Sequence, residues 1–157
     1  MLRTLALLRH GLASGQAPAS GLLPEGAAHL RRLGSLLQSE GWRPGAIVSS
    51  PYARARDSAA ILVMVFGGGL KLELLPELIP EAEPDVALAA LRAVAPSDAP
   101  LLVVSHLPLV GRLAHELIGD DPGFSPGTLV EIALEAGGAG RLLRRVGPRD
   151  IPEAFGK

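Results

Sequence analysis

The sequence predicts an α/β domain of three layers (α/β/α), with a mostly parallel central sheet between helices and a hairpin near its C-terminal end. Short apolar runs alternate with longer segments of helical spacing, which is the pattern of repeated βαβ units. These runs lack polar alternation, as expected for strands covered on both faces. A chain of 157 residues is most simply one domain, here residues 1–157.

The first strand, the first loop and the first helix are read from the N-terminal 40 residues. Leu2 to Leu8 is almost continuously apolar and predicts a buried strand. The loop from Gly11 to Pro24 is long for a structureless connection, and such loops are often functional. A helix is expected over Glu25 to Glu40, with His29 on its polar, exposed side. Its apolar face comprises Ala27, Leu30, Leu33, Leu36 and Leu37.

The second βα unit follows directly. Ala46 to Ser49 predicts a strand, after which Ser50 is a suitable N-cap and Pro51 occupies the favoured first position of a helix. This helix is expected to end near Phe66, because three consecutive glycines follow it. Leu70 to Leu75 alternates in polarity and predicts a third, shorter strand.

The next segment combines an acidic loop with two helices and the most apolar strand of the chain. The loop runs from Pro76 to Pro84, and a helix is expected from about Asp85 to Val94. Leu101 to Ser105 predicts a buried strand, and Pro108 opens a further helix that ends near Gly119.

A terminal hairpin completes the predicted fold. Its strands are Thr128 to Leu134 and Arg141 to Val146, and a glycine-rich turn separates them.

Composition excludes several classes of function. The formal net charge is −1, so no electrostatic argument supports binding to nucleic acid or to an anionic membrane. The chain contains no cysteine, which excludes disulfides, thiolate metal sites and a cysteine nucleophile. The N-terminal apolar stretch is too short for a membrane span or a signal peptide, and Arg9 interrupts it. We therefore expect a cytoplasmic protein. We also expect that it uses neither a metal nor a cofactor.

Three strand-to-helix junctions carry the polar residues of interest. They are Arg9-His10-Gly11, the segment from Ser49 to Arg54, and Ser105-His106. In an open α/β sheet the carboxyl ends of the strands meet at one crevice, so these junctions are expected to form one site. Arg54 falls in the first turn of its helix, where free N–H groups and the helix dipole attract anions.

Arg9, His10, Arg54 and His106 together suit a tetrahedral phosphate dianion. Arginine presents a planar fork that matches phosphate oxygens. His10 attacks phosphorus only as a neutral imidazole, and the carbonyl of Gly11 is a candidate for fixing its tautomer. Beside the bound anion, His106 is expected to be protonated and to stabilise charge on the transferred oxygens. Phosphoryl transfer mainly requires such positioning and electrostatic support.

The same three segments resemble the histidine phosphatase superfamily, also called the phosphoglycerate mutase-like family. The strings from Ser105 to Gly111 and from Leu75 to Leu78 are most similar to the short SixA-type phosphohistidine phosphatases. The resemblance implies a phosphoglycerate mutase-like fold, transient phosphorylation of His10, and phosphate binding by the remaining members of the site, Arg9, Arg54 and His106.

Two features depart from the family pattern. Leu23 stands where the family often has a threonine, and the general acid of larger members has two candidates, Glu77 and Glu81. An ester leaves as an alkoxide and benefits strongly from a proton donor, whereas phosphohistidine leaves as a neutral imidazole and needs less help. A weak or missing acid therefore favours phosphohistidine. Ser14 and Gly15 are further candidate phosphate donors in the first loop.

Three functions follow, in order of preference. The first is a metal-independent phosphatase that forms phospho-His10 and acts on phosphohistidine in a signalling or phosphotransfer protein, releasing inorganic phosphate. The second is a phosphatase of small esters, such as sugar, nucleotide or cofactor-precursor phosphates. The third is a non-catalytic phosphate-recognition module. No nucleic acid or membrane partner is expected. Outside the site, Arg56 is expected in a salt bridge and His115 in a structural role.

Overall fold

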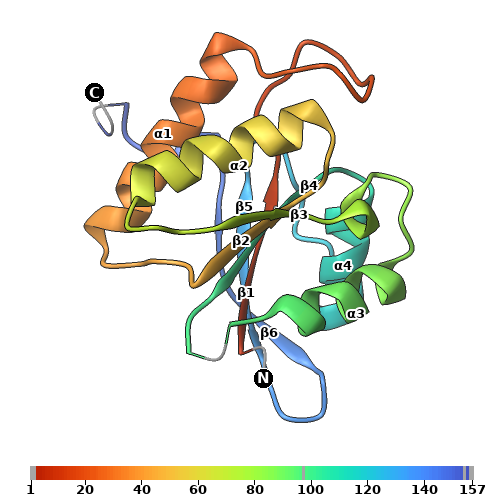
Figure 1. Cartoon of the computed structure of the whole chain (residues 1–157). Helices are drawn as coiled ribbons and strands as arrows, with labels where there is room; N and C mark the ends of the chain where they lie inside the picture. Colours follow the sequence, from red (N-terminus) through yellow and green to blue (C-terminus); the bar gives the residue numbers. More distant parts are fainter. Residues whose placement is uncertain (1–2, 97, 154, 156–157) are drawn as a thin grey trace.

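The computed structural model describes residues 3–96, 98–153 and 155, and within them the chain forms a mixed six-stranded sheet and four α-helices (Figure 1). Leu2, at the start of the first predicted strand, lies outside the described residues. The helices are α1 (Pro24–Ser39), α2 (Ala53–Phe66), α3 (Pro84–Val94) and α4 (Leu109–Ile118). The strands are β1 (Thr4–Arg9), β2 (Ala46–Ser49), β3 (Leu72–Leu74), β4 (Leu101–Ser105), β5 (Leu129–Leu134) and β6 (Gly140–Val146).

The strand order is β3-β2-β4-β1-β5-β6, with the first four strands parallel to one another. β5 runs antiparallel to β1, and β6 runs antiparallel to β5. This confirms the predicted α/β class, the mostly parallel sheet and the C-terminal hairpin. The third strand is shorter than predicted, because β3 is an edge strand that pairs with β2 only from Leu72 to Leu74.

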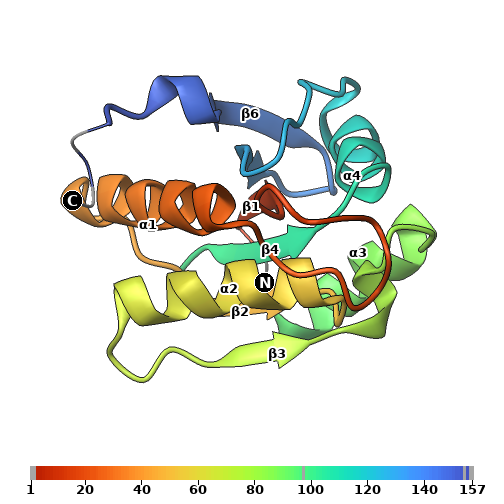
Figure 2. The ribbon, with the colours of Figure 1, turned by 90° about the horizontal axis from the view of Figure 1, so that it is seen from above.

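The side chains of the central strands divide the core into two parts, one on each face of the sheet. Leu5 and Leu7 of β1 pack with residues of α3 and α4, whereas Ala6 and Leu8 pack with residues of α1 and α2. The helices accordingly cover opposite faces of the sheet (Figure 1; Figure 2). Strands buried on both faces need apolar residues at every position, which explains their continuous apolar runs. Among the described residues, no helix is long and apolar enough to cross a membrane.

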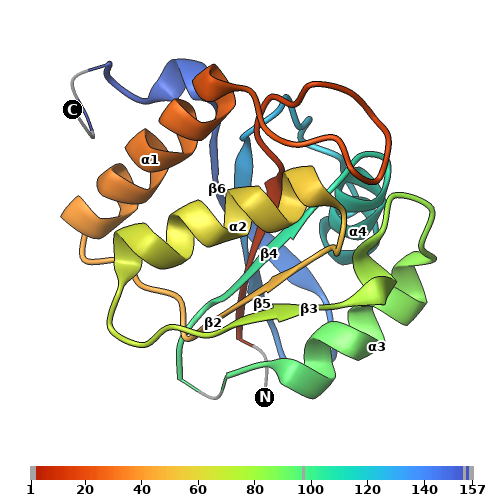
Figure 3. The same ribbon diagram turned by 45° about the horizontal axis from the view of Figure 1, so that its top comes forward.

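The first loop lies over the carboxyl end of the parallel strands. After β1 it passes above the N-terminal end of α2 (Figure 3). The N–H of Ala53, the first residue of α2, donates to the carbonyl of Pro18 in this loop at 2.9 Å. The loop therefore contributes to the same edge of the sheet as the three junctions.

The prediction that His29 is exposed is wrong. Its side chain is only 6% exposed, and its Nε2 lies 2.8 Å from the carbonyl oxygen of Gly127. The buried face of α1 also includes Gly26 and Gly34, so it is wider than the leucine spacing indicates. The segment before β5 packs over this end of α1 and covers the histidine.

The predicted start of α2 is also displaced. The helix begins at Ala53, so Ser50 is not its N-cap and Pro51 precedes its first turn. The Ser50 hydroxyl instead accepts the N–H of Tyr52 at 3.2 Å, which forms a local turn before the helix.

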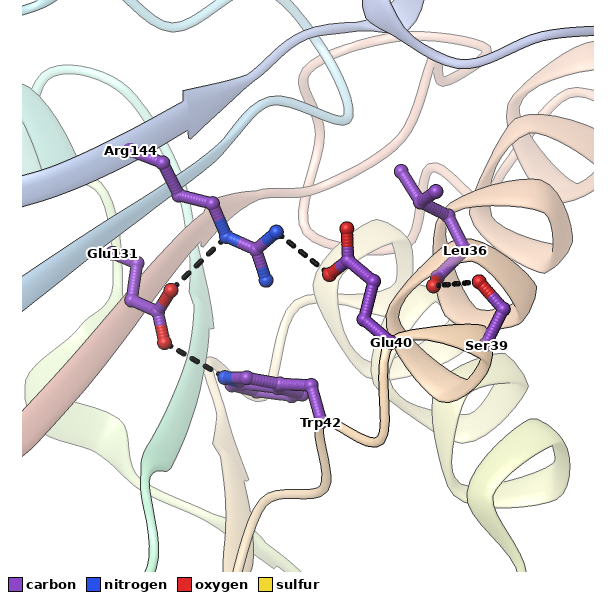
Figure 4. Close-up of polar contacts among 6 residues, drawn as sticks. All are labelled: Leu36, Ser39, Glu40, Trp42, Glu131 and Arg144. Carbon is purple, nitrogen blue, oxygen red and sulfur yellow. Dashed lines mark hydrogen bonds and ion pairs between the residues drawn. The ribbon is translucent and has the colours of Figure 1, made fainter.

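A second polar cluster joins the C-terminal end of α1 to the hairpin. We call it the Arg144 cluster, and its members are Glu40, Trp42, Glu131 and Arg144. Arg144 donates to Glu131 at 3.0 Å and to Glu40 at 2.7 Å, and the indole N–H of Trp42 donates to Glu131 at 2.7 Å (Figure 4). Glu131 is 8% exposed, so its charge is buried and fully paired. This arrangement fastens the C-terminal end of α1 to β5 and β6.

Candidate active site

The three junctions meet at the carboxyl ends of β2, β4 and β1, which are neighbours in the sheet. The register pairs Arg9 with Ser105, so His10 and His106 leave adjacent strands side by side. Their ring centroids are 5.1 Å apart. Arg54 is the second residue of α2, the helix that follows β2, and its side chain reaches the same place. The predicted convergence of Arg9, His10, Arg54 and His106 is thus present, around a cavity of about 650 Å³.

The hydrogen bonds of His10 define its tautomer. Its Nδ1 lies 2.7 Å from the carbonyl oxygen of Gly11, which can only accept, so Nδ1 carries the proton. Its Nε2 therefore presents a lone pair, and the Nε–H of Arg54 donates to it at 3.2 Å. The predicted contact of the Gly11 carbonyl with His10 is confirmed, and Nε2 is the ring nitrogen that bears the lone pair.

The protein environment keeps both histidines neutral. Burial lowers the pKa of His10 to about 4, and the positive charges of Arg54 and Arg9 act in the same direction against the hydrogen bond to Gly11. Burial, His10 and the two arginines lower the pKa of His106 to about 3. A 1% exposed ring beside two cations disfavours a further charge, so these protein groups by themselves keep His106 neutral. The expectation that His106 is protonated beside a bound phosphate stays a prediction.

The two arginines of the cavity have no carboxylate partner among the described residues. The guanidinium of Arg9 donates to the carbonyl of Phe124 at 2.9 Å, and that of Arg54 donates to the carbonyl of Ala17 at 2.9 Å. Burial, the main cause, lowers the pKa of both groups. Positive charge that is held by carbonyl groups and left without a counter-ion favours an anionic ligand.

A buried hydroxyl connects the first and second junctions. Ser58 is fully buried, accepts the N–H of Gly11 at 3.0 Å and donates to the carbonyl of Arg54 at 2.7 Å. A side chain at Gly11 would be crowded, since an added Cβ would lie 3.0 Å from Leu30 and 3.2 Å from a backbone oxygen of Gly26. These contacts fix the position of Gly11, whose carbonyl orients His10.

The remaining predicted residues separate into two groups. Glu81 lines the cavity, as do Ser14 and Gly15, whereas Glu77 does not belong to the described wall. Ser14 uses its N–H for the carbonyl of Gly21 at 2.9 Å, so its hydroxyl is the donor left for a ligand. Glu81 is exposed, and its charge acts on Arg54. Of the two candidate acids, Glu81 lines the cavity, whereas one carboxylate oxygen of Glu77 is buried and has no hydrogen-bond partner among the described residues.

Sequence reasoning missed the supporting residues of the site. Ser58 follows Arg54 by four residues, and this helical spacing places both on one face of α2, which is a usable signal. The carbonyl of Phe124, which holds Arg9, comes from an irregular segment with no such signal. Outside the site, Arg56 lies 3.6 Å from Asp57, which confirms the predicted salt bridge.

The sequence and the structure both have similar counterparts among known proteins. Residues 5–80 match the family model described as the histidine phosphatase superfamily, branch 1. The chain is 27% identical to the phosphohistidine phosphatase SixA of Escherichia coli (strain K12) over 154 residues, which cover 94% of this chain and 96% of that protein.

Two solved structures extend the comparison. The protein histidine phosphatase SixA complexed with tungstate superposes with a TM-score of 0.85 at 26% identity, covering 94% of this chain and 98% of that one. A mycobacterial glucosyl-3-phosphoglycerate phosphatase superposes with a TM-score of 0.71 at 20% identity, covering 89% and 96%. The latter likeness shows a shared fold alone.

Proposed function

Because the chain belongs to the histidine phosphatase superfamily and is a phosphatase, we propose that it hydrolyses protein phosphohistidine through a phosphorylated His10. The observation that carries this proposal is the state of His10. Its Nδ1 is bound to the Gly11 carbonyl, and its Nε2 lone pair faces the cavity beside Arg54. With a pKa of about 4, the ring is neutral at neutral pH and ready to attack.

The residues of the cavity account for both halves of the reaction. Nε2 of His10 forms a bond to phosphorus while the P–N bond of the substrate breaks and its imidazole leaves with the proton of its other nitrogen. Arg54 moves from Nε2 to the phosphoryl oxygens, and Arg9 and His106 hold the same group. Water then attacks phospho-His10, which releases inorganic phosphate and restores the ring.

Two findings support phosphohistidine as the substrate class. SixA of Escherichia coli is a phosphohistidine phosphatase of nearly the same length, and the solved SixA holds tungstate, a tetrahedral oxyanion like phosphate. The site also needs no strong proton donor for an imidazole leaving group. A phosphotransfer protein that carries phosphohistidine on its surface is therefore the proposed partner.

A phosphatase of small esters is the second candidate, and the position of Glu81 favours it. This carboxyl group lies on the cavity wall and is able to protonate an alkoxide leaving group. The two candidates differ in their need for this residue, since imidazole leaves without such help.

Replacement of the nucleophile tests the shared part of the proposal. His10→Asn should lower kcat/KM by about 10⁴-fold or more, because no other group replaces the attacking atom. His115→Asn, in an exposed position of α4, is the matched control and should keep wild-type activity. Wild-type protein given a labile phosphodonor should yield an acid-labile, base-stable phosphoenzyme. Normal turnover by His10→Asn would refute the mechanism.

A comparison of substrates separates the two candidates. We expect kcat/KM for a phosphorylated histidine-phosphotransfer domain to exceed that for sugar and nucleotide monophosphates by at least about 100-fold, as different leaving groups imply. Glu81→Gln should change the rate with phosphohistidine by less than about threefold, because the leaving imidazole needs no acid. Fast turnover of esters that Glu81→Gln abolishes would instead establish the second candidate.

A further inference from the structure

Ser50 contacts the ring of His106, and this contact determines which ring nitrogen carries the proton. The Ser50 hydroxyl is fully buried and lies 2.7 Å from Nε2 of His106. The same oxygen accepts the N–H of Tyr52 at 3.2 Å. Nδ1 of His106 is buried and has no partner among the described residues, while the ring lines the cavity.

Counting donors and acceptors selects one tautomer. If Nε2 carried the proton, the Ser50 oxygen would accept twice, and its own buried hydrogen would have no acceptor among the described residues. Nδ1 would then offer a bare lone pair to an arriving anion. If Nδ1 carries the proton, the Ser50 O–H donates to Nε2 while its oxygen accepts from Tyr52, and every group around Ser50 is satisfied.

We propose that Ser50 is a positioning residue that holds neutral His106 as its Nδ1–H tautomer, so that His106 donates one hydrogen bond from Nδ1 to the transferred phosphoryl group. The role in turnover rests on the proposed function, whereas the tautomer does not. A neutral donor explains how a buried ring beside two arginines assists an anion without carrying a charge itself.

The same contact explains why two adjacent histidines have different roles. Both rings carry their proton on Nδ1, and both direct the Nε2 lone pair to a donor. For His10 that donor is the side chain of Arg54, which is able to move to the phosphoryl group and release the lone pair. For His106 the donor is Ser50, which has no accessible surface and directly follows β2. Ser50 therefore keeps the lone pair of His106 occupied and leaves His10 as the nucleophile.

Nitrogen NMR tests the tautomer directly. In protein labelled with ¹⁵N-histidine, the His106 signals, assigned by their loss in His106→Asn, should show a protonated Nδ1 and an unprotonated Nε2 at neutral pH. In Ser50→Ala the population with a protonated Nε2 should rise. A wild-type ring with its proton on Nε2 would overturn the proposal, whatever the substrate of the protein.

Kinetics test the role in turnover. Ser50→Ala should lower kcat by about 10- to 100-fold and change KM less, as expected for a misplaced contact to the reacting group. Ser50→Thr keeps the hydroxyl and should restore most of kcat. Ser49→Ala removes a neighbouring buried hydroxyl that donates to a backbone carbonyl, and should stay within about threefold of wild type.

The outcomes separate the two proposals. Wild-type kcat in a folded Ser50→Ala variant would refute the positioning role while leaving phospho-His10 intact. Inactivity of the wild-type protein toward every phosphorylated substrate would refute the proposed function and leave the NMR result standing. If Ser50→Ala does not fold, the wild-type spectrum and the Ser50→Thr kinetics still decide the question.

Discussion

Arg54 and Arg144 are both held by several hydrogen bonds, but within the described part of the chain only Arg144 has carboxylate partners. Burial alone would lower the pKa of Arg144, yet the hydrogen bonds and charges of Glu40 and Glu131 outweigh it and raise the pKa. Around Arg54 burial prevails and lowers the pKa. One guanidinium is neutralised by the fold itself, and the other is left for an external anion.

This difference separates a structural polar cluster from a functional one. The Arg144 cluster satisfies each charge internally, so removing one member should harm the fold. The cavity keeps Arg9, Arg54 and two neutral histidines together at a cost in desolvation, which only a bound anion offsets. Paired charges therefore indicate stability here, and unpaired charges indicate function.

The strongest test of this comparison is removal of the unpaired cation. Arg54→Ala should lower kcat/KM by about 10²- to 10³-fold, because a charge-assisted contact to the phosphoryl group disappears. Its free energy of unfolding should stay equal to wild type or increase, since a desolvated cation is removed. Steady-state kinetics and urea denaturation measure the two quantities. A large loss of stability without a loss of kcat/KM would reverse the assignment.

The opposite result is expected for the paired cation. Arg144→Met should lower the free energy of unfolding by about 1–3 kcal/mol, because Glu131 keeps a buried charge with only Trp42 as partner. The value of kcat/KM should stay within about twofold. The double variant Glu131→Leu with Arg144→Met removes both charges and should recover part of the lost stability. If the double variant is no more stable than Arg144→Met, the penalty does not come from the isolated carboxylate.

A pH titration gives the most graded effect. The folded pKa values of His10 and His106, about 4 and about 3, lie below the unfolded value near 6.5, so the unfolded chain binds more protons between these limits. Stability should be complete above pH 6.5 and fall as the pH drops toward 3. The slope is at most about 1.4 kcal/mol per pH unit for each histidine.

Urea denaturation at several pH values measures this slope, and His106→Asn should reduce it. The value of kcat/KM should fall with a midpoint near pH 4 as His10 becomes protonated, instead of near 6.5. Stability that does not change between pH 7 and pH 4 would show that the cavity does not disfavour the charged rings.

Most of the fold was predictable from the sequence because its central strands are buried on both faces. Leu101 to Ser105 forms β4 with the predicted bounds, and Arg141 to Val146 differs from β6 by one residue. His29 was mispredicted for a physical reason. Its burial depends on Gly127, which is 98 residues away, and no local periodicity reports such a contact.

The site was predictable at the level of its four principal side chains but not of their support. Arg9, His10, Arg54 and His106 stand at strand ends, and topology alone brings strand ends together. Ser50 has the local sequence of a helix cap, and its contact with His106, 56 residues away, depends on the pairing of β2 with β4. Tautomers follow from such tertiary contacts, so they require the structure.

The pairing of Arg9 with Ser105 has a consequence for the geometry of this pocket. Because adjacent strands lie about 4.8 Å apart, the backbone itself sets the separation of the two histidines, and the ring distance of 5.1 Å stays close to it. The pairing of the two strands thus holds both rings at one side of the same cavity, at a separation that the loops do not set.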